Sequence, residues 1–133
     1  MESLLLIDGF NVLHAGVLTG RDRANWWQTP AQRRLVERVE RFADPLYPVL
    51  WIVFDRRERR TSDPQAPEEV TSTDTRIRIF YAPSADDWIV AQVEQQTARC
   101  HVTVVTADRL LRDRVRQVGG KLLSPSQFLA GSS

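Results

Sequence analysis

The sequence predicts an α/β fold in which helices cover both faces of a central, mainly parallel sheet of five strands. Two observations carry this prediction. Short apolar runs of strand length alternate along the chain with longer segments of helical periodicity. The runs at 4–7 and 49–54 are apolar at every position, which is typical of parallel strands buried on both faces.

Length and composition indicate a single domain over residues 1–133. Of the 133 residues 42% are apolar, which suits one globular domain and leaves little room for two. The apolar run at 49–54 is far too short to cross a membrane, and the first residues do not resemble a signal peptide. One cysteine, Cys100, excludes an internal disulfide and a cysteine-rich metal site. We therefore expect a cytoplasmic protein with no membrane partner.

The basic residues are almost all arginine. The net charge is only +1, but 17 of the 18 basic residues are arginine and Lys121 is the one lysine. Guanidinium groups bind phosphate oxygens bidentately. A GC-rich genome would also favour arginine codons, so the composition alone does not decide between the two explanations.

The first predicted strand, 4–7, stops at Asp8. Gly9 then permits a sharp turn, in which Asn11 can form a local hydrogen bond. The segment 12–28 shows no clear pattern.

The first helix is predicted to begin at Thr29. Thr29 would be the N-cap, Pro30 the first helical residue and Gln32 the partner in a capping box. Apolar residues then recur at helical spacing as far as Phe42, and Asp44 followed by proline would end the helix.

The second predicted strand, 49–54, again ends at a carboxylate, Asp55. A long polar connection over 56–75 follows, and loops of this length in compact domains are either mobile or functional. Alternating residues at 76–81 predict a third, less central strand. The remaining elements are a helix, a strand, a helix, a short strand and a final cap, which begin at Ser84, Val102, Asp108, Lys121 and Ser124.

Carboxylates stand where these strands end. In a parallel sheet Asp8, Asp55 and Asp108 reach the same edge, and Asp86 and Asp87 join them from the start of the next helix. Like charges gathered there repel one another unless a cation lies among them. Oxygen ligands without a cysteine or histidine cluster select Mg²⁺ or Mn²⁺. Such a site suits attack of water on a phosphodiester.

Three motifs resemble one known family. The residues Leu-Leu-Ile-Asp-Gly-Phe-Asn-Val at 5–12 are similar to the "DGYN" strand of NYN domains, which are PIN-like ribonucleases. The segment 81–89 resembles the "ADD" helix start of their YacP-like branch, and 104–109 its "VTSDR" element. The motifs occur in the family's order at compatible spacing, so the resemblance covers nearly the whole chain.

The resemblance implies a PIN-like three-layer α/β/α sandwich and a divalent-metal endoribonuclease, which hydrolyses single-stranded or structured RNA with metal-activated water. By motif position Asp8, Asp86 and Asp108 would be catalytic and hold Mg²⁺ or Mn²⁺, with Asn11 supporting them. The sequence departs from the family at Phe10, where tyrosine is usual. Related sites often add an acidic residue from the first helix, and Glu37 or Glu40 could supply it.

Several of these aspartates also have a structural explanation. Asp108 could be only a helix N-cap. Asp87 occupies a capping-box position after Ser84, which favours a structural role, whereas Asp86 has no such role and favours a ligand. Asp55 and Asp87 are left open as further metal ligands.

Other residues have weaker claims to function. His14, His101 and Asp113 are interpreted as structural, and the pair Trp26-Trp27 as packing rather than base stacking. The cluster Arg56, Arg57, Arg59 and Arg60 could bind RNA phosphates or form a solvated loop, and we favour the phosphates.

Two other functions are alternatives to a nuclease. The first is a catalytically inactive PIN-like module that binds RNA or proteins, against which the three retained carboxylates argue. The second is a haloacid-dehalogenase phosphatase, which needs an aspartate where Phe10 stands and is therefore excluded. RNA is the expected partner, and a homodimer is left open.

Overall fold

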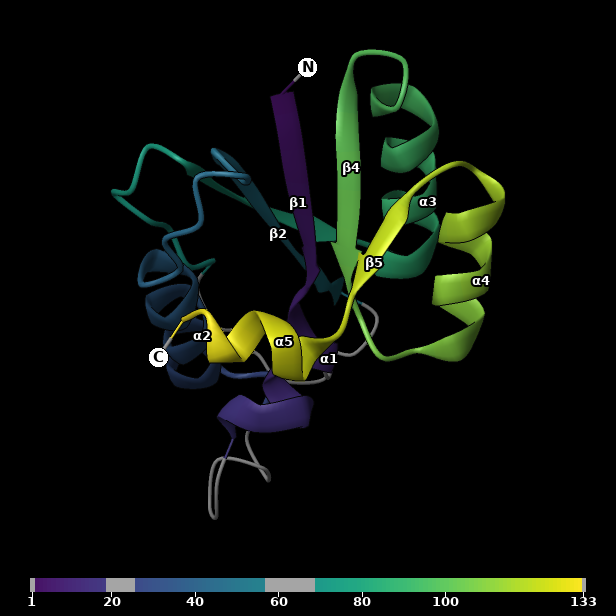
Figure 1. Cartoon of the computed structure of the whole chain (residues 1–133). Coiled ribbons are helices and arrows are strands. Elements are labelled where there is room, and N and C mark those ends of the chain that lie inside the picture. Colours follow the sequence, from purple (N-terminus) through teal and green to yellow (C-terminus); the bar gives the residue numbers. More distant parts are fainter. Residues whose placement is uncertain (1, 19–25, 57–68, 133) are drawn as a thin grey trace.

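The computed structural model describes residues 2–18, 26–56 and 69–132. Its centre is a five-stranded sheet, formed by β1 (Glu2–Asp8), β2 (Val49–Asp55), β3 (Ile77–Ala82), β4 (Cys100–Val105) and β5 (Lys121–Leu123). The strand order is β3-β2-β1-β4-β5, and every neighbouring pair is parallel. The predicted parallel sheet of five strands is confirmed (Figure 1).

Helices cover both faces of this sheet and make the predicted three layers. One face carries α1 (Gly9–Val12), the π-helix η1 (Leu13–Val17), α2 (Thr29–Glu40) and α5 (Pro125–Ala130). The other carries α3 (Ala85–Gln96) and α4 (Arg109–Gln117). Figure 1 shows these two layers on either side of β1 and β4. None of the described helices has the length and apolar character needed to cross a membrane.

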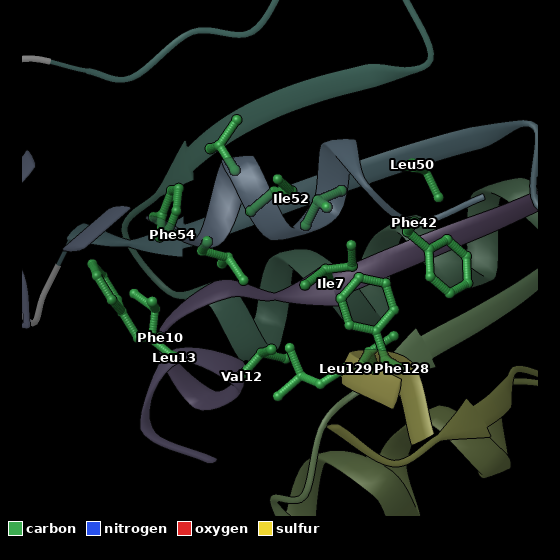
Figure 2. Packing of buried hydrophobic residues seen from close by; sticks show 14 of the residues in the cluster. Ile7, Phe10, Val12, Leu13, Phe42, Leu50, Ile52, Phe54, Phe128 and Leu129 are labelled. Carbon is green, nitrogen blue, oxygen red and sulfur yellow. The ribbon is translucent and has the colours of Figure 1, made fainter. Parts of the chain in front are cut away.

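Strand β1 is buried on both faces, as its apolar run predicts. Leu5 and Ile7 pack into the core under α2 and α5, which Figure 2 shows around Ile7. Leu4 and Leu6 point to the opposite face and pack against α3 and α4. Each fully buried side chain of this kind contributes about 1.5–3 kcal/mol. The two cores therefore hold β1 at the centre of the sheet, with Asp8 at its carboxyl end.

The chain changes its direction of travel across the sheet beside β1. It first builds outward through β2 to β3 at one edge, and α3 then carries it back to β4 on the other side of β1. In open parallel sheets, ligands bind outside the carboxyl ends of the strands at such a switch point. Here that point lies between the ends of β1 and β4.

The prediction for the start of the first helix is wrong. Thr29 is already helical and Gln28 is the N-cap, without a side-chain hydrogen bond. Gln32 does not complete a capping box either. It is fully buried, donates to the Trp27 carbonyl (2.9 Å) and accepts from the Tyr81 hydroxyl (2.6 Å). Gln32 thus satisfies buried polar groups of the tertiary structure rather than the helix end.

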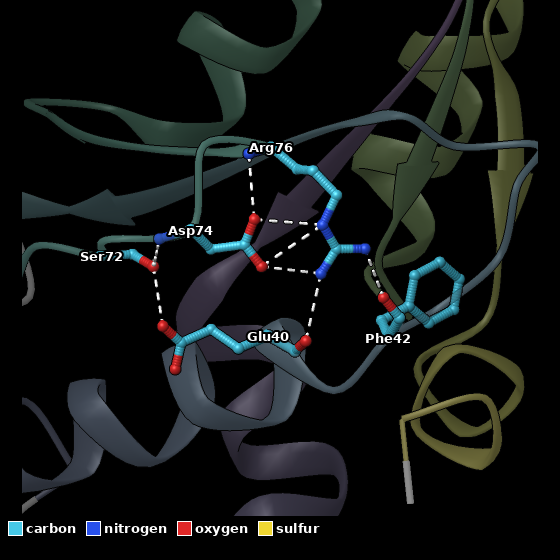
Figure 3. Close-up of polar contacts among 5 residues, drawn as sticks. All are labelled: Glu40, Phe42, Ser72, Asp74 and Arg76. Atoms are coloured by element: carbon cyan, nitrogen blue, oxygen red, sulfur yellow. Dashed lines mark hydrogen bonds and ion pairs between the residues drawn. The ribbon is translucent and has the colours of Figure 1, made fainter.

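The predicted end of this helix is also wrong, because α2 stops at Glu40. The guanidinium of Arg76 donates to the carbonyls of Glu40 (3.1 Å) and Phe42 (2.7 Å), and it pairs with Asp74 (2.7 Å), as Figure 3 shows. Glu40 in turn accepts from the Ser72 hydroxyl (2.8 Å). A cation at the helix C-terminus stabilises the unpaired carbonyls. Arg76 therefore ends α2 from a distant part of the chain.

The segment after Asp8, for which the sequence predicts a turn and then no clear pattern, is helical from Gly9 to Val17. Gly9 begins α1, and η1 continues it to Val17. The other caps are as predicted. Ser84 and Asp108 accept from the helices that follow them, and Ser124 and Gln127 form a capping box.

The pair of Asp74 and Arg76 should make stability depend on pH in acid. The hydrogen bond from Arg76 lowers the pKa of Asp74 below its usual 3.8. A lowered carboxyl pKa stabilises the fold above the unfolded-state value, and this contribution is lost as the pH falls through the folded-state value. Asp74→Asn should therefore cost about 1 kcal/mol at pH 7. Urea unfolding at neutral pH and below the usual carboxyl pKa should show this cost shrinking in acid, and a cost that does not change with pH would contradict the assignment.

Candidate active site at the carboxyl ends of the strands

A pocket of about 210 Å³ opens at the carboxyl edge of the sheet, at the switch point. The pocket is lined by four of the carboxylates that the sequence predicts at this edge, together with four neighbouring residues. The lining residues are Asp8, Phe10, Asn11, His14, Asp55, Ala85, Asp86 and Asp108. The structure thus brings together residues from the ends of β1 and β2, from α1 and η1, from the start of α3 and from the N-cap of α4.

Thr106 directly follows β4 and links the ends of β1 and β4 through Asp8, which lines the pocket. It is fully buried, and its hydroxyl donates to Oδ2 of Asp8 (2.9 Å). The hydroxyl oxygen of Thr106 also accepts from the backbone N–H of Asp108 (3.2 Å). One hydroxyl therefore fixes the carboxylate of β1 relative to the residue that starts α4. No pattern in the sequence indicates this role of Thr106.

Asn11 ties the same two segments together from the other side. Its side-chain oxygen accepts from the backbone N–H of Ala107 (2.9 Å), 96 positions away in the chain, and so it does not serve the expected local turn.

Gly9 has no Cβ, and this allows the chain after Asp8 to pass close to β2. A Cβ there would lie 2.7 Å from the Phe54 ring and 2.8 Å from the Val53 carbonyl oxygen.

Asp55 holds the beginning of α3. It is 8% exposed, and Oδ2 accepts from the backbone N–H of Ala85, the first residue of that helix (3.2 Å). The next residue is Asp86, half-buried in the pocket wall. Asp55 therefore lines the pocket and also positions the helix turn that carries Asp86.

Asp108 and Asp87 have different surroundings. Asp108 lines the pocket and is also the N-cap of α4, because Oδ1 accepts from the N–H of Leu111 (3.1 Å). Asp87 does not line the pocket. Its backbone N–H donates to Ser84, and its exposed carboxylate pairs with Arg114 of α4 (2.9 Å). A structural role thus accounts for these contacts of Asp87, whereas Asp108 has a structural role and also lines the pocket.

Three helices begin around the pocket, and their positive ends face its negative charge. Asp8 precedes α1, Asp55 binds the first N–H of α3, and Asp108 caps α4. An anion at a helix N-terminus gains about 0.3–1 kcal/mol when exposed, and more when partly buried. The fold can therefore gather four carboxylates because the helix ends offset part of their repulsion.

His14 is a pocket residue that sequence analysis interpreted as structural. It is exposed in η1, lines the pocket, and packs on Trp26 with ring centroids 5.0 Å apart. Asn11 and His14 are three residues apart, so a helix after Asp8 would place both on one face. Residues 12–28 show no helical pattern in the sequence, so the sequence does not indicate that His14 lies beside Asn11. Trp26 also packs on Phe10 (4.9 Å) beside the first core, in line with the packing interpretation.

The remaining candidates lie elsewhere. Arg56 pairs with Glu69 (2.5 Å), whereas Arg57, Arg59 and Arg60 lie outside the described residues. Glu37, Glu40, His101 and Asp113 do not line the pocket.

The donors of the pocket suit a hard cation, although they do not form a closed cage. Within the described ranges, no three aspartate, glutamate, histidine or cysteine side chains are close enough together to hold a metal ion. Mg²⁺ is usually bound by one or two carboxylates, with water and substrate phosphates as the other ligands. An open pocket lined by four carboxylates fits that mode of binding.

Comparisons with known proteins agree with this architecture. A family model described as the YacP-like NYN domain matches residues 5–131. The crystal structure of Rae1 (YacP) from Bacillus subtilis, a W164L mutant, is similar with a TM-score of 0.68 at 18% sequence identity. That match covers 98% of this chain and 74% of the other. No sequence match to a curated protein was found.

The bonds of Thr106 predict a specific pattern of stability. Thr106→Val keeps the shape but leaves the N–H of Asp108 without this acceptor and Asp8 without this donor, which should cost about 1–3 kcal/mol. Thr106→Ser keeps the hydroxyl and should cost about 1 kcal/mol for the lost methyl group. Urea unfolding measures both variants. If serine were no better than valine, the hydroxyl would not hold the two strands together as described.

Proposed function

Because the chain belongs to the family of YacP-like NYN domains, a nuclease-like family, we propose that it is a divalent-metal-dependent endoribonuclease. One observation supports this proposal most strongly. Carboxylates from the ends of β1 and β2, from the start of α3 and from the cap of α4 line a single pocket. Bonds to helix ends account for Asp55 and Asp108 singly, but they do not require four carboxylates to line one pocket, where like charges repel one another.

In this proposal Asp8, Asp86 and Asp108 would hold Mg²⁺ or Mn²⁺, directly or through water bound to the ion, and Asp55 keeps Asp86 in place through α3. The cation, when bound, supplies positive charge to the attacked phosphate and lowers the pKa of water for the attack. The reaction is hydrolysis of an RNA phosphodiester. Among the described residues that line the pocket, the donor side chains beside Asn11 and His14 are carboxylates, and carboxylate oxygens favour these hard cations.

The other pocket residues position these groups and the substrate. Asn11 and Thr106 fix the loop between β4 and α4, so that Asp108 keeps its place relative to Asp8. His14, exposed at the rim, can hydrogen-bond to a phosphate oxygen or a ribose hydroxyl. Phe10 is almost fully buried between Phe54 and Trp26, so it supplies packing where the family's tyrosine would also offer a hydroxyl.

A second candidate function is an inactive PIN-like module that binds RNA or a protein. The lack of a closed three-ligand cluster within the described ranges favours it. The two functions differ in whether RNA is cut when a divalent metal is present.

Cleavage of labelled RNA separates them. The wild type should cut RNA with Mg²⁺ or Mn²⁺ and leave 5′-phosphate and 3′-hydroxyl ends, because water is the nucleophile. Asp8→Asn, Asp86→Asn and Asp108→Asn should each lower the rate about a hundredfold or more while the protein stays folded. Asp108→Asn is the sharpest of the three, since asparagine caps a helix as well as aspartate does.

Asp87→Asn is the matched control, since its carboxylate lies outside the pocket, and it should cut RNA at the wild-type rate. Cyclic phosphate ends, or activity that survives EDTA, would contradict hydrolysis by a metal site. Binding of RNA with no cleavage under any divalent metal would favour the binding module.

A further inference from the structure

The exposed face of α4 carries a row of arginines that begins one residue beyond the pocket. Arg109, Arg112 and Arg116 line a groove of about 280 Å³, together with Asp113. The three arginines are spaced by three and four residues, so they share one side of the helix. The two residues that α4 buries, Leu111 and Val115, lie on a different side of the helix. We call it the α4 arginine groove.

The groove is positively charged, because one carboxylate stands against three guanidinium groups. Asp113 lies 3.5 Å from Arg116, and both side chains are more than half exposed, so the pair is weak. Arg114, the fourth arginine of α4, pairs with Asp87 on another side of the helix. It is therefore held away from the groove.

Arg112 connects the groove to the pocket. Its Nη1 donates to the backbone carbonyl of Thr106 (3.0 Å), and the hydroxyl of the same threonine donates to Asp8 (2.9 Å). Asp108, which lines the pocket, is the residue directly before Arg109. The near end of the groove is thus fixed in position relative to the carboxylates.

From this geometry we infer that the α4 arginine groove binds the backbone phosphates of a single RNA strand whose scissile phosphate enters the pocket. The inference rests on the proposed function and adds the path of the substrate. A pocket lined by four carboxylates repels a polyanion, and adjacent guanidinium groups offset that repulsion while matching phosphate oxygens. The row from Arg109 to Arg116 spans about 10 Å of helix. Two or three phosphates cover that length at about 3.4 Å or more each.

The test compares two double variants of equal charge change. Arg109→Gln with Arg116→Gln removes the two ends of the row and keeps Arg112, whose bond to Thr106 also serves the fold. Arg41→Gln with Arg99→Gln is the control. Both of its residues are exposed, and they follow the C-terminal ends of α2 and α3, at the opposite edge of the sheet. A fluorescent single-stranded RNA is titrated in EDTA over a series of salt concentrations, so that binding is read without cleavage.

Each lost contact to a single strand should reduce the slope of log K against log salt by about 0.7, so the groove variant should be shallower by about 1.4. The control should keep the wild-type slope. Equal slopes in the groove variant and the wild type would overturn the inference, as would a wild type that does not bind the RNA. Binding of a poly-glutamate peptide with equal affinity would assign the groove to an acidic protein instead.

RNA cleavage, measured separately with Mn²⁺, tests the proposed nuclease function independently of binding in the groove. A wild type that cuts RNA while the groove variant keeps its salt slope would refute the groove alone. A groove variant with the reduced slope, in a protein that never cuts RNA, would refute the nuclease and leave the groove standing.

Discussion

The buried hydroxyl of Thr106 is the interaction on which the candidate site depends. It holds the carboxylate of Asp8, at the end of the central strand, against the backbone N–H of Asp108, at the start of α4. Asn11 closes the same junction through Ala107. The backbone ladder between β1 and β4 stops at Ile7 and Val105, before the loop that carries Asp108, and these bonds continue the junction beyond it. Packing in the two cores fixes the position of β1. The bonds at this junction then fix the positions of Asp8 and Asp108 in the pocket.

The aspartates of the pocket serve the fold and the proposed chemistry together. Asp55 binds the start of α3 and Asp108 caps α4, so each offsets the unpaired N–H groups of a helix while it faces the pocket. A structural role for such a residue is therefore no argument against a functional one. Asp87 makes the contrast clear, because it has a capping position and an ion pair but no place in the pocket.

Local patterns in the sequence predicted the sheet, the layers and the caps at Ser84, Asp108 and Ser124, because these depend on apolar periodicity and on neighbouring residues. They were wrong where contacts between residues far apart in the sequence determine the local structure. Arg76 ends α2 at Glu40, and burial takes Gln32 away from the helix cap. The strand-end carboxylates could be predicted because parallel strands share one carboxyl edge. Thr106, His14 and the far partner of Asn11 could not, since each depends on how α1 and the end of β4 meet.

The central claim is that Asp8, Asp86 and Asp108 share a divalent cation in this pocket. Anomalous X-ray scattering from crystals soaked in Mn²⁺ tests it most directly, because it locates the ion without relying on activity. We predict one strong peak in the pocket, in contact with Asp8 and at least one of the other two carboxylates, and no such peak in Asp8→Asn crystals. A pocket without a peak at Mn²⁺ concentrations that support cleavage, or a peak bound elsewhere on the protein, would contradict the claim.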